Sequence, residues 1–107
     1  MDKDQIYLEE IKEFCGKILF FISEKDFADF LADEKLQLAI VKLIENVGEA
    51  AKRLSQRERD NKSHIPWKKV MAMRDRLVHD YMDVDLTIVY DVAINEIATL
   101  LDTLQAR

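Results

Sequence analysis

The chain has few of the residues that break or cross-link a fold. Its 107 residues include two glycines, one proline and one cysteine. With so few glycine and proline residues the chain can form few tight turns, which favours long helices over a sheet with many hairpins. The lone Cys15 excludes an internal disulfide and a cysteine-based metal site, as is typical of proteins in a reducing cytosol. We therefore expect a helical, cytoplasmic protein.

Long apolar segments are also missing. The longest apolar run, residues 18–22, is too short to span a bilayer. The polar and acidic residues 1–5 lack the basic start and apolar stretch of a signal peptide. We therefore expect no membrane association. A chain of this length holds one hydrophobic core, which predicts a single domain over residues 1–107.

The charge is unevenly distributed. The net charge of −5 argues against nucleic-acid binding when it is taken alone. Residues 52–76, however, hold nine basic and three acidic residues, for a net charge of +6. A basic centre of this kind could bind a phosphate chain locally. The alternative is that these side chains only solvate a helix end and a loop.

Apolar residues recur with helical periodicity along most of the chain. The pattern predicts helices over about residues 4–22, 34–55, 67–81 and 86–105, with Asp33 and Asp85 as N-caps. A short extra helix is expected through Phe27 and Phe30, after a possible capping box from Ser23 to Asp26. Residues 56–65 are predicted to form a polar loop. The expected fold is an all-α antiparallel bundle of four main helices.

Gly48 lies inside the predicted second long helix. Glycine destabilises a helix interior relative to alanine, and the usual structural reason for it is the close approach of another helix. We therefore expect a neighbouring element to pack closely at this position.

The helix expected at residues 67–81 contains an unusual charge. With about 100° of turn per residue, Arg74 falls near the middle of the apolar sector that includes Val70 and Leu77. A guanidinium in such a sector needs a partner. It could extend to solvent or meet a carboxylate such as Glu49, or it could hold an anion in a cavity or a dimer interface.

Asp75 and His79 would lie side by side on this helix, four residues apart. A carboxylate beside an imidazole fixes its tautomer and raises its basicity, which suits proton transfer. A surface pair of little energetic weight is the alternative. Arg74 and His79 are five residues apart and do not share an ideal helix face. A working site that uses both is therefore expected to need two chains.

These residues resemble the HEPN signature, in which an arginine, a polar residue and a short spacer precede a histidine. Asp80 and Tyr81 extend the motif to the His-x-Tyr form of its HepT-like toxins, of the HepT/MntA toxin–antitoxin type. Residues 46–52 resemble the Gly-Glu-Ala helix of that branch. Residues 65–67 with 71–74 resemble its Ile-Pro-Trp and Gly-Met-Arg-Asn run. Asp75 stands where that branch commonly has asparagine, and Ala72 where it has glycine.

The resemblance implies a HEPN-like fold, a homodimer and metal-independent cleavage of RNA, with tRNA as one candidate substrate. It implies that Arg74 and His79 are catalytic, that Asp75 supports them, and that neither a metal nor another cofactor takes part. Attack by a ribose 2′-OH on the adjacent phosphorus would leave a 2′,3′-cyclic phosphate and a 5′-OH. A non-catalytic helical module that binds a nucleotidyltransferase or a nucleotide is the second hypothesis.

Tyr81 carries a regulatory hypothesis that the resemblance implies. A partner nucleotidyltransferase antitoxin would attach AMP to this tyrosine and silence the nuclease. If the helix continues, Tyr81 is nearly eclipsed with Arg74, seven residues earlier, so the added phosphate could compete with RNA for Arg74. Alternatively, Tyr81 only closes the apolar stripe.

Overall fold

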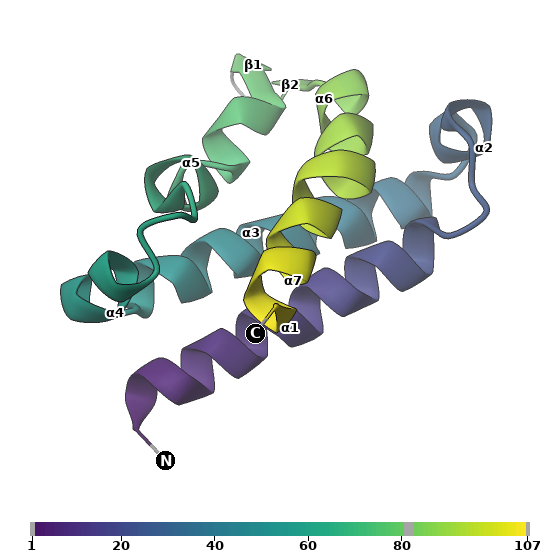
Figure 1. The fold of residues 1–107 in the computed structure, drawn as a ribbon. Coiled ribbons are helices and arrows are strands. Elements are labelled where there is room, and N and C mark those ends of the chain that lie inside the picture. Colours follow the sequence, from purple (N-terminus) through teal and green to yellow (C-terminus); the bar gives the residue numbers. More distant parts are fainter. Residues whose placement is uncertain (1, 81–82, 107) are drawn as a thin grey trace.

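The protein is an all-α bundle, as its periodicity predicts (Figure 1). The computed structural model describes residues 2–80 and 83–106, and of His79 and Asp80 it describes the backbone. The α-helices are α1 (Lys3–Ile22), α2 (Phe27–Leu31), α3 (Glu34–Arg53), α4 (Gln56–Asn61), α5 (Trp67–Met71), α6 (Leu86–Asp91) and α7 (Ile97–Gln105). A 3-10 turn η1 (Arg74–Leu77), two short strands β1 (Val78–Asp80) and β2 (Asp83–Val84), and a π-helical turn η2 (Val92–Glu96) complete the described chain.

The two longest helices, α1 and α3, lie side by side and run in opposite directions (Figure 1). The predicted stripe of α1 is its buried face: Leu8, Ile11, Cys15, Ile18 and Ile22. Asp33 caps α3 as expected, with its side chain accepting from the backbone N–H of Leu36. Helical periodicity is local information, and for these helices it was sufficient.

The C-terminal helix is continuous from Leu86 to Gln105 but contains the π turn η2. The side chain of Asp85 caps its start, as predicted, and accepts from the N–H groups of Thr87 and Ile88. Val92 and Ala93 in the π turn and Ile97 after it are fully buried. This helix therefore closes the core over α1 and α3 while its backbone is locally widened.

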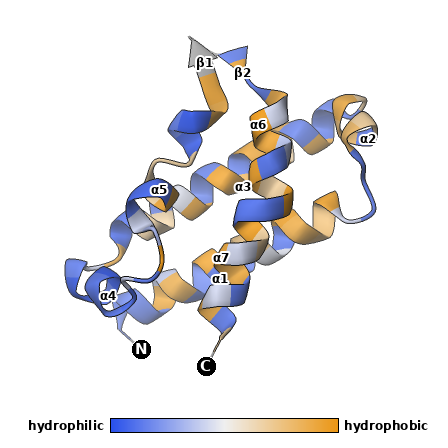
Figure 2. Cartoon of the chain, turned by 45° about the horizontal axis from the view of Figure 1, so that its top comes forward, coloured by the Kyte–Doolittle hydropathy of each residue, from blue (hydrophilic) through white to orange (hydrophobic). Residues whose placement is uncertain are grey.

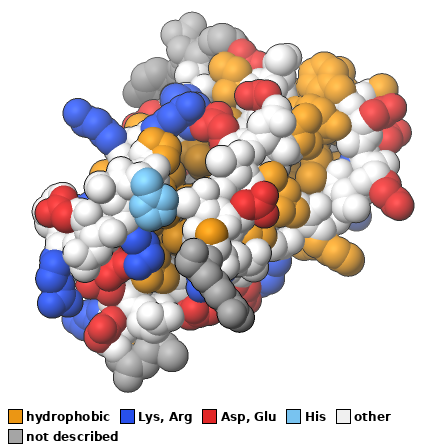
Figure 3. Space-filling view, in the orientation of Figure 1, with side chains coloured by type: hydrophobic (Ala, Val, Ile, Leu, Met, Phe, Trp, Pro, Cys, Tyr) orange, Lys and Arg blue, Asp and Glu red, His pale blue; other side chains and the backbone are white. Residues whose placement is uncertain are grey.

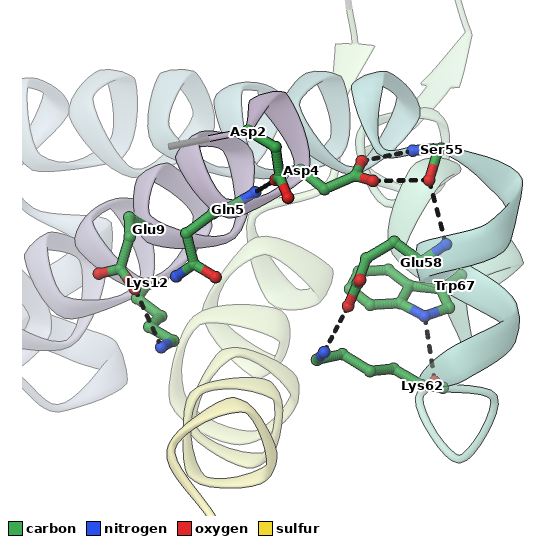
Figure 4. Close-up of polar contacts among 9 residues, drawn as sticks. All are labelled: Asp2, Asp4, Gln5, Glu9, Lys12, Ser55, Glu58, Lys62 and Trp67. Atoms are coloured by element: carbon green, nitrogen blue, oxygen red, sulfur yellow. Dashed lines mark hydrogen bonds and ion pairs between the residues drawn. The ribbon is translucent and has the colours of Figure 1, made fainter.

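Two short elements differ from the expectations. The short helix α2 is present, but Asp26 rather than Ser23 caps it, in a capping box with Asp29. The expected loop after residue 55 contains α4, which Ser55 caps. The carboxylate of Asp4 accepts from both the N–H and the hydroxyl of Ser55, each at 2.7 Å (Figure 4). That contact from α1 explains why a polar segment holds a helical turn here.

The hydropathy of the helices differs between the core and the periphery of the bundle. Figure 2 shows α4 as almost wholly hydrophilic, whereas α1 and α3 alternate between hydrophobic and hydrophilic residues. Trp67 is buried at the start of α5, as expected of a core anchor, and its indole N–H donates to the carbonyl of Lys62 (Figure 4). Among the described residues, no helix has the length and apolar character needed to cross a membrane.

The prediction of one helix over residues 67–81 was wrong. The α-helix ends at Met71, and the chain continues as η1 and then as β1, which pairs antiparallel with β2. Val70, Met73 and Leu77 stay buried through this change. A continued α-helix would have placed Arg74 in the same buried sector, where an unpaired guanidinium is unfavourable. The tighter turn leaves Arg74 in solvent and keeps Leu77 in the core.

Gly48 lies where the end of α5 packs against α3. A Cβ built at Gly48 would stand 3.5 Å from the carbonyl oxygens of both Val70 and Met71. The expected close contact is therefore present, at an ordinary van der Waals distance that alanine would also allow. It brings the last turn of α5, and with it the start of η1, directly against α3.

Candidate active site

Arg74 is the first residue of η1, and its side chain is exposed. About 59% of the side chain is accessible, and its Nε lies 3.4 Å from a carboxylate oxygen of Glu45 on α3. This is the alternative of an arginine that extends to solvent and meets a carboxylate of the neighbouring helix, although the carboxylate is Glu45 and not Glu49, one turn further along. A second contact, 3.9 Å long, joins Arg74 to Asp75. Exposed pairs of this kind are weak, which leaves the guanidinium available to another anion.

A cleft of about 350 Å³ opens beside Arg74. Its apolar contributions are Gly48 and Met71, where α5 approaches α3. Its charged lining consists of two cations and three carboxylates: Lys52, Arg74, Glu45, Glu49 and Asp75. The cleft therefore has the size and charged groups to hold a polar ligand, although its lining carries a net charge of −1.

His79 lies in β1, five residues after Arg74. The argument that placed Asp75 beside His79 required both on one α-helix, and it fails because Asp75 lies in η1 and His79 in a strand. The side chain of Asp75 is 75% exposed and contacts Arg74. Tyr81 lies outside the described residues. The helical alignment expected between Tyr81 and Arg74 does not apply, since the α-helix ends ten residues before Tyr81.

The basic segment at residues 52–76 is largely neutralised by ion pairs. Five of its nine cations contact a carboxylate, namely Lys52, Lys62, Lys69, Arg74 and Arg76. Figure 3 shows basic and acidic side chains interleaved along one edge of the molecule. The segment is therefore no continuous basic surface. Its distinctive cation is Arg74, which is exposed at the cleft.

Arg76 is a second arginine of η1, and its role was not foreseen. Its NH1 and NH2 donate to the two carboxylate oxygens of Glu96 at 3.1 and 2.7 Å. These hydrogen bonds hold the pKa of Glu96 below its ordinary value, although partial burial acts in the opposite direction. The sequence offered one signal for this pair: Glu96 directly precedes Ile97, a residue of the apolar stripe, so its carboxylate was placed near the core.

Among the described residues, no group of three or more histidine, cysteine, aspartate or glutamate side chains is arranged to hold a metal ion. The cysteine is unsuited to nucleophilic chemistry for a separate reason. Burial in the core raises the pKa of the Cys15 thiol to about 12. The reactive thiolate form is therefore suppressed in the folded protein.

The protein is thus a helical bundle with an exposed arginine on a 3-10 turn and a histidine on the strand that follows. The chain belongs to the HepT-like ribonuclease family, whose model matches residues 5–107.

Similar curated proteins include one named "Probable ribonuclease HepT" from Thermococcus cleftensis, which is 36% identical over 88% of this chain and 86% of its own length. Another, named "Putative RNase", is from Caldanaerobacter subterraneus subsp. tengcongensis and is 36% identical over 88% of this chain and 84% of its own. No solved structure was found to match.

Proposed function

We propose that this chain is a toxin-type endoribonuclease that cleaves RNA without a metal ion, with Arg74 and His79 as catalytic residues. One observation carries the proposal. The Arg74 guanidinium is exposed beside a cleft, held only by exposed or partly exposed carboxylates, on a turn that leads directly into the strand of His79. Membership of the HepT-like ribonuclease family and the names of the relatives support the same activity.

The chemistry requires three functions at one phosphate. A base removes the proton of the ribose 2′-OH, the oxygen attacks the phosphorus, and an acid returns a proton to the departing 5′ oxygen. The imidazole of His79 can serve as the base or as the acid, but one imidazole cannot serve as both at once. The Arg74 guanidinium can donate to the phosphate oxygens as negative charge develops on them. The products are a 2′,3′-cyclic phosphate and a 5′-OH.

A homodimer would supply the second imidazole that the reaction requires. Two copies of the segment from η1 to β1, facing each other across a two-fold axis, would supply two arginines and two histidines to one RNA strand. In this arrangement Asp75 supports the site through its contact with Arg74 rather than through a helical contact with His79. The dimer is therefore part of the proposed active site.

The proposal also includes regulation by a partner protein. A partner nucleotidyltransferase antitoxin would transfer AMP to Tyr81, which follows His79 by two residues. The added phosphate would bring a negative charge close to the site and compete with RNA for the guanidinium of Arg74. RNA, with tRNA as one candidate, would be the substrate of the unmodified protein.

The second candidate is a helical module that binds a nucleotidyltransferase or a nucleotide without cleaving RNA. The specific observation in its favour is the acidity of the cleft, where Glu45, Glu49 and Asp75 outnumber Arg74 and Lys52. An acidic lining repels a polyphosphate chain unless a partner or a second copy adds positive charge.

The experiment incubates the purified chain with labelled RNA in excess chelator. We expect cleavage that Arg74→Ala and His79→Ala each reduce by about two to three orders of magnitude. Arg57→Ala, which removes an exposed arginine on α4 outside the cleft, is the matched control and should cleave normally. Mass spectrometry should find 2′,3′-cyclic phosphate ends. Equal cleavage by the wild type and both site variants would refute the assignment.

An expression test separates the two candidate functions. Expression of the unaccompanied chain should arrest growth, and His79→Ala should relieve the arrest. A stable complex with a nucleotidyltransferase, formed by a chain that cleaves no RNA, would favour the binding module.

A further inference from the structure

The arginine most firmly held near the site is Arg76, two residues beyond Arg74. Arg76 donates one hydrogen bond to each carboxylate oxygen of Glu96, the two-bond pairing that adds both strength and geometric specificity to an arginine–carboxylate contact. The side chains of Arg76 and Glu96 are only 33% and 22% exposed. The Nε of Arg76 is buried and makes no hydrogen bond with the described residues. The guanidinium therefore makes its hydrogen bonds through NH1 and NH2.

Glu96 contacts the elements on both sides of the turn at residues 72–73, namely α5 before it and η1 after it. Its carboxylate lies 3.7 Å from the Nζ of Lys69 on α5, in addition to its bonds with Arg76 in η1. One side chain of the C-terminal helix therefore holds the last helical segment before the turn and the 3-10 segment after it. Leu77, which follows Arg76, is buried, and its carbonyl accepts from the N–H of Asp85 at 2.7 Å.

The backbone of the C-terminal helix departs from α-helical geometry at this point. Glu96 is the last residue of the π turn η2, and Ile97 directly after it is fully buried. Single π turns in otherwise regular helices frequently occur at functional sites. Here the turn ends with Ile97 in the core and Glu96 at its edge, facing η1.

We propose that Arg76 and Glu96 are positioning residues, whose two-bond pair fixes η1, and thereby the direction in which η1 presents Arg74 to an RNA phosphate and the point at which the backbone enters the strand of His79. The inference rests on the proposed ribonuclease function. Neither side chain needs to touch RNA. A lysine at position 76 would keep the charge but lose the planar two-bond geometry, so it would not replace the arginine.

The experiment compares Arg76→Lys and Glu96→Gln with a matched control. The control is Glu58→Gln, which breaks the ion pair between Glu58 on α4 and Lys62, the residue that follows α4; the exposure of this pair is similar, at 16% and 34%. Circular dichroism establishes the temperature range in which each variant is folded, and all assays are made there. The reversed pair Arg76→Glu with Glu96→Arg tests for rescue.

Two readouts separate positioning from a general loss of stability. In steady-state cleavage, we expect the two single variants to lower kcat by about 10²-fold, the loss that a displacement of about 1 Å can produce, with little change in KM. Hydrogen exchange should become faster at the N–H groups of Arg76 and Asp85, which bond to Met73 and Leu77. The control should change neither readout, and the reversed pair should recover part of both.

The outcomes distinguish the two levels of the argument. A wild type that leaves RNA intact, or whose cleavage is unaffected by Arg74→Ala and His79→Ala, overturns the proposed function and this inference with it. An active wild type that loses cleavage in those site variants, while Arg76→Lys and Glu96→Gln keep normal kcat, overturns the positioning role alone. A control variant that loses as much kcat as they do also overturns it.

Discussion

In the proposed site, Glu45 is the carboxylate that an RNA phosphate would displace from Arg74. It lies 3.4 Å from the Nε of Arg74 and 3.9 Å from the Nζ of Lys42. In Glu45→Gln, the amide has nearly the same shape as the carboxylate but carries no charge. The guanidinium is then free of its main ionic partner before RNA arrives. We therefore predict that this substitution strengthens RNA binding.

The structure limits how large the effect can be. The side chains of Arg74 and Glu45 are 59% and 31% exposed, and ion pairs with this exposure are worth about 0.2–1 kcal/mol. If RNA binding must first break that pair, its removal should lower Kd by a factor of about 1.4 to 5. The free energy of unfolding should fall by no more than about 1 kcal/mol, for the same reason.

The assay uses the His79→Ala background, so that RNA is bound but not cleaved. Fluorescence anisotropy with a labelled single-stranded RNA gives Kd at fixed ionic strength. Glu49→Gln is the matched control, because Glu49 lines the same cleft but pairs with Lys52 at 3.2 Å rather than with Arg74. Both substitutions remove one negative charge from the cleft. The larger gain in affinity should come from Glu45→Gln.

Two results would refute this reasoning. A Kd that rises in Glu45→Gln would show that Glu45 orients Arg74 productively instead of competing for it. Equal gains from Glu45→Gln and Glu49→Gln would show that only the overall charge of the cleft matters.

Three further predictions concern stability and reactivity. Gly16→Ala should raise the free energy of unfolding by about 0.5–1 kcal/mol in urea titrations, because Gly16 lies inside α1 with no atom within 4 Å of an added Cβ; a loss would contradict the helical argument. Glu96 has a lowered pKa in the folded state, so its contribution to stability is present above the ordinary pKa of glutamate, about 4.3, and is lost as pH falls through the folded value. Urea titrations should therefore show Glu96→Gln destabilising the protein at pH 7 but much less at pH 3, and a difference independent of pH would count against the pair. Cys15 should react with a thiol reagent at pH 8 only at the rate of unfolding, and rapid labelling of native protein would disprove its burial.

The long helices could be predicted because their information is local. Periodicity located the buried face of α1, and the acidic residues Asp33 and Asp85 marked helix starts through hydrogen bonds that span two or three residues. Gly48 likewise announced a close contact before its partner was known. The motif from Arg74 to Tyr81 was identified by resemblance, and the roles of its residues stay predictions.

The geometry of that motif could not be predicted from periodicity. The apolar spacing of Val70, Met73 and Leu77 suits a continued α-helix as well as the observed turn, since all three are buried in the structure. Whether the chain continues as an α-helix or turns depends on whether the Arg74 side chain can reach solvent and on the pairing of β1 with β2. The first is a property of the assembled core, and the second involves β2, which lies beyond the helix expected at residues 67–81.

What the chain carries locally is therefore its helices, their caps, and the residues from which an active site can be built. Their arrangement depends on partners far away in sequence: Glu45 lies 29 residues from Arg74, and Glu96 lies 20 residues from Arg76. Packing of α3 and of the C-terminal helix against η1 brings these carboxylates to the two arginines. It places one arginine in solvent beside a cleft and holds the other at the edge of the core. Only folding decides which arginine is the more exposed, because burial and ion pairing depend on the surrounding helices.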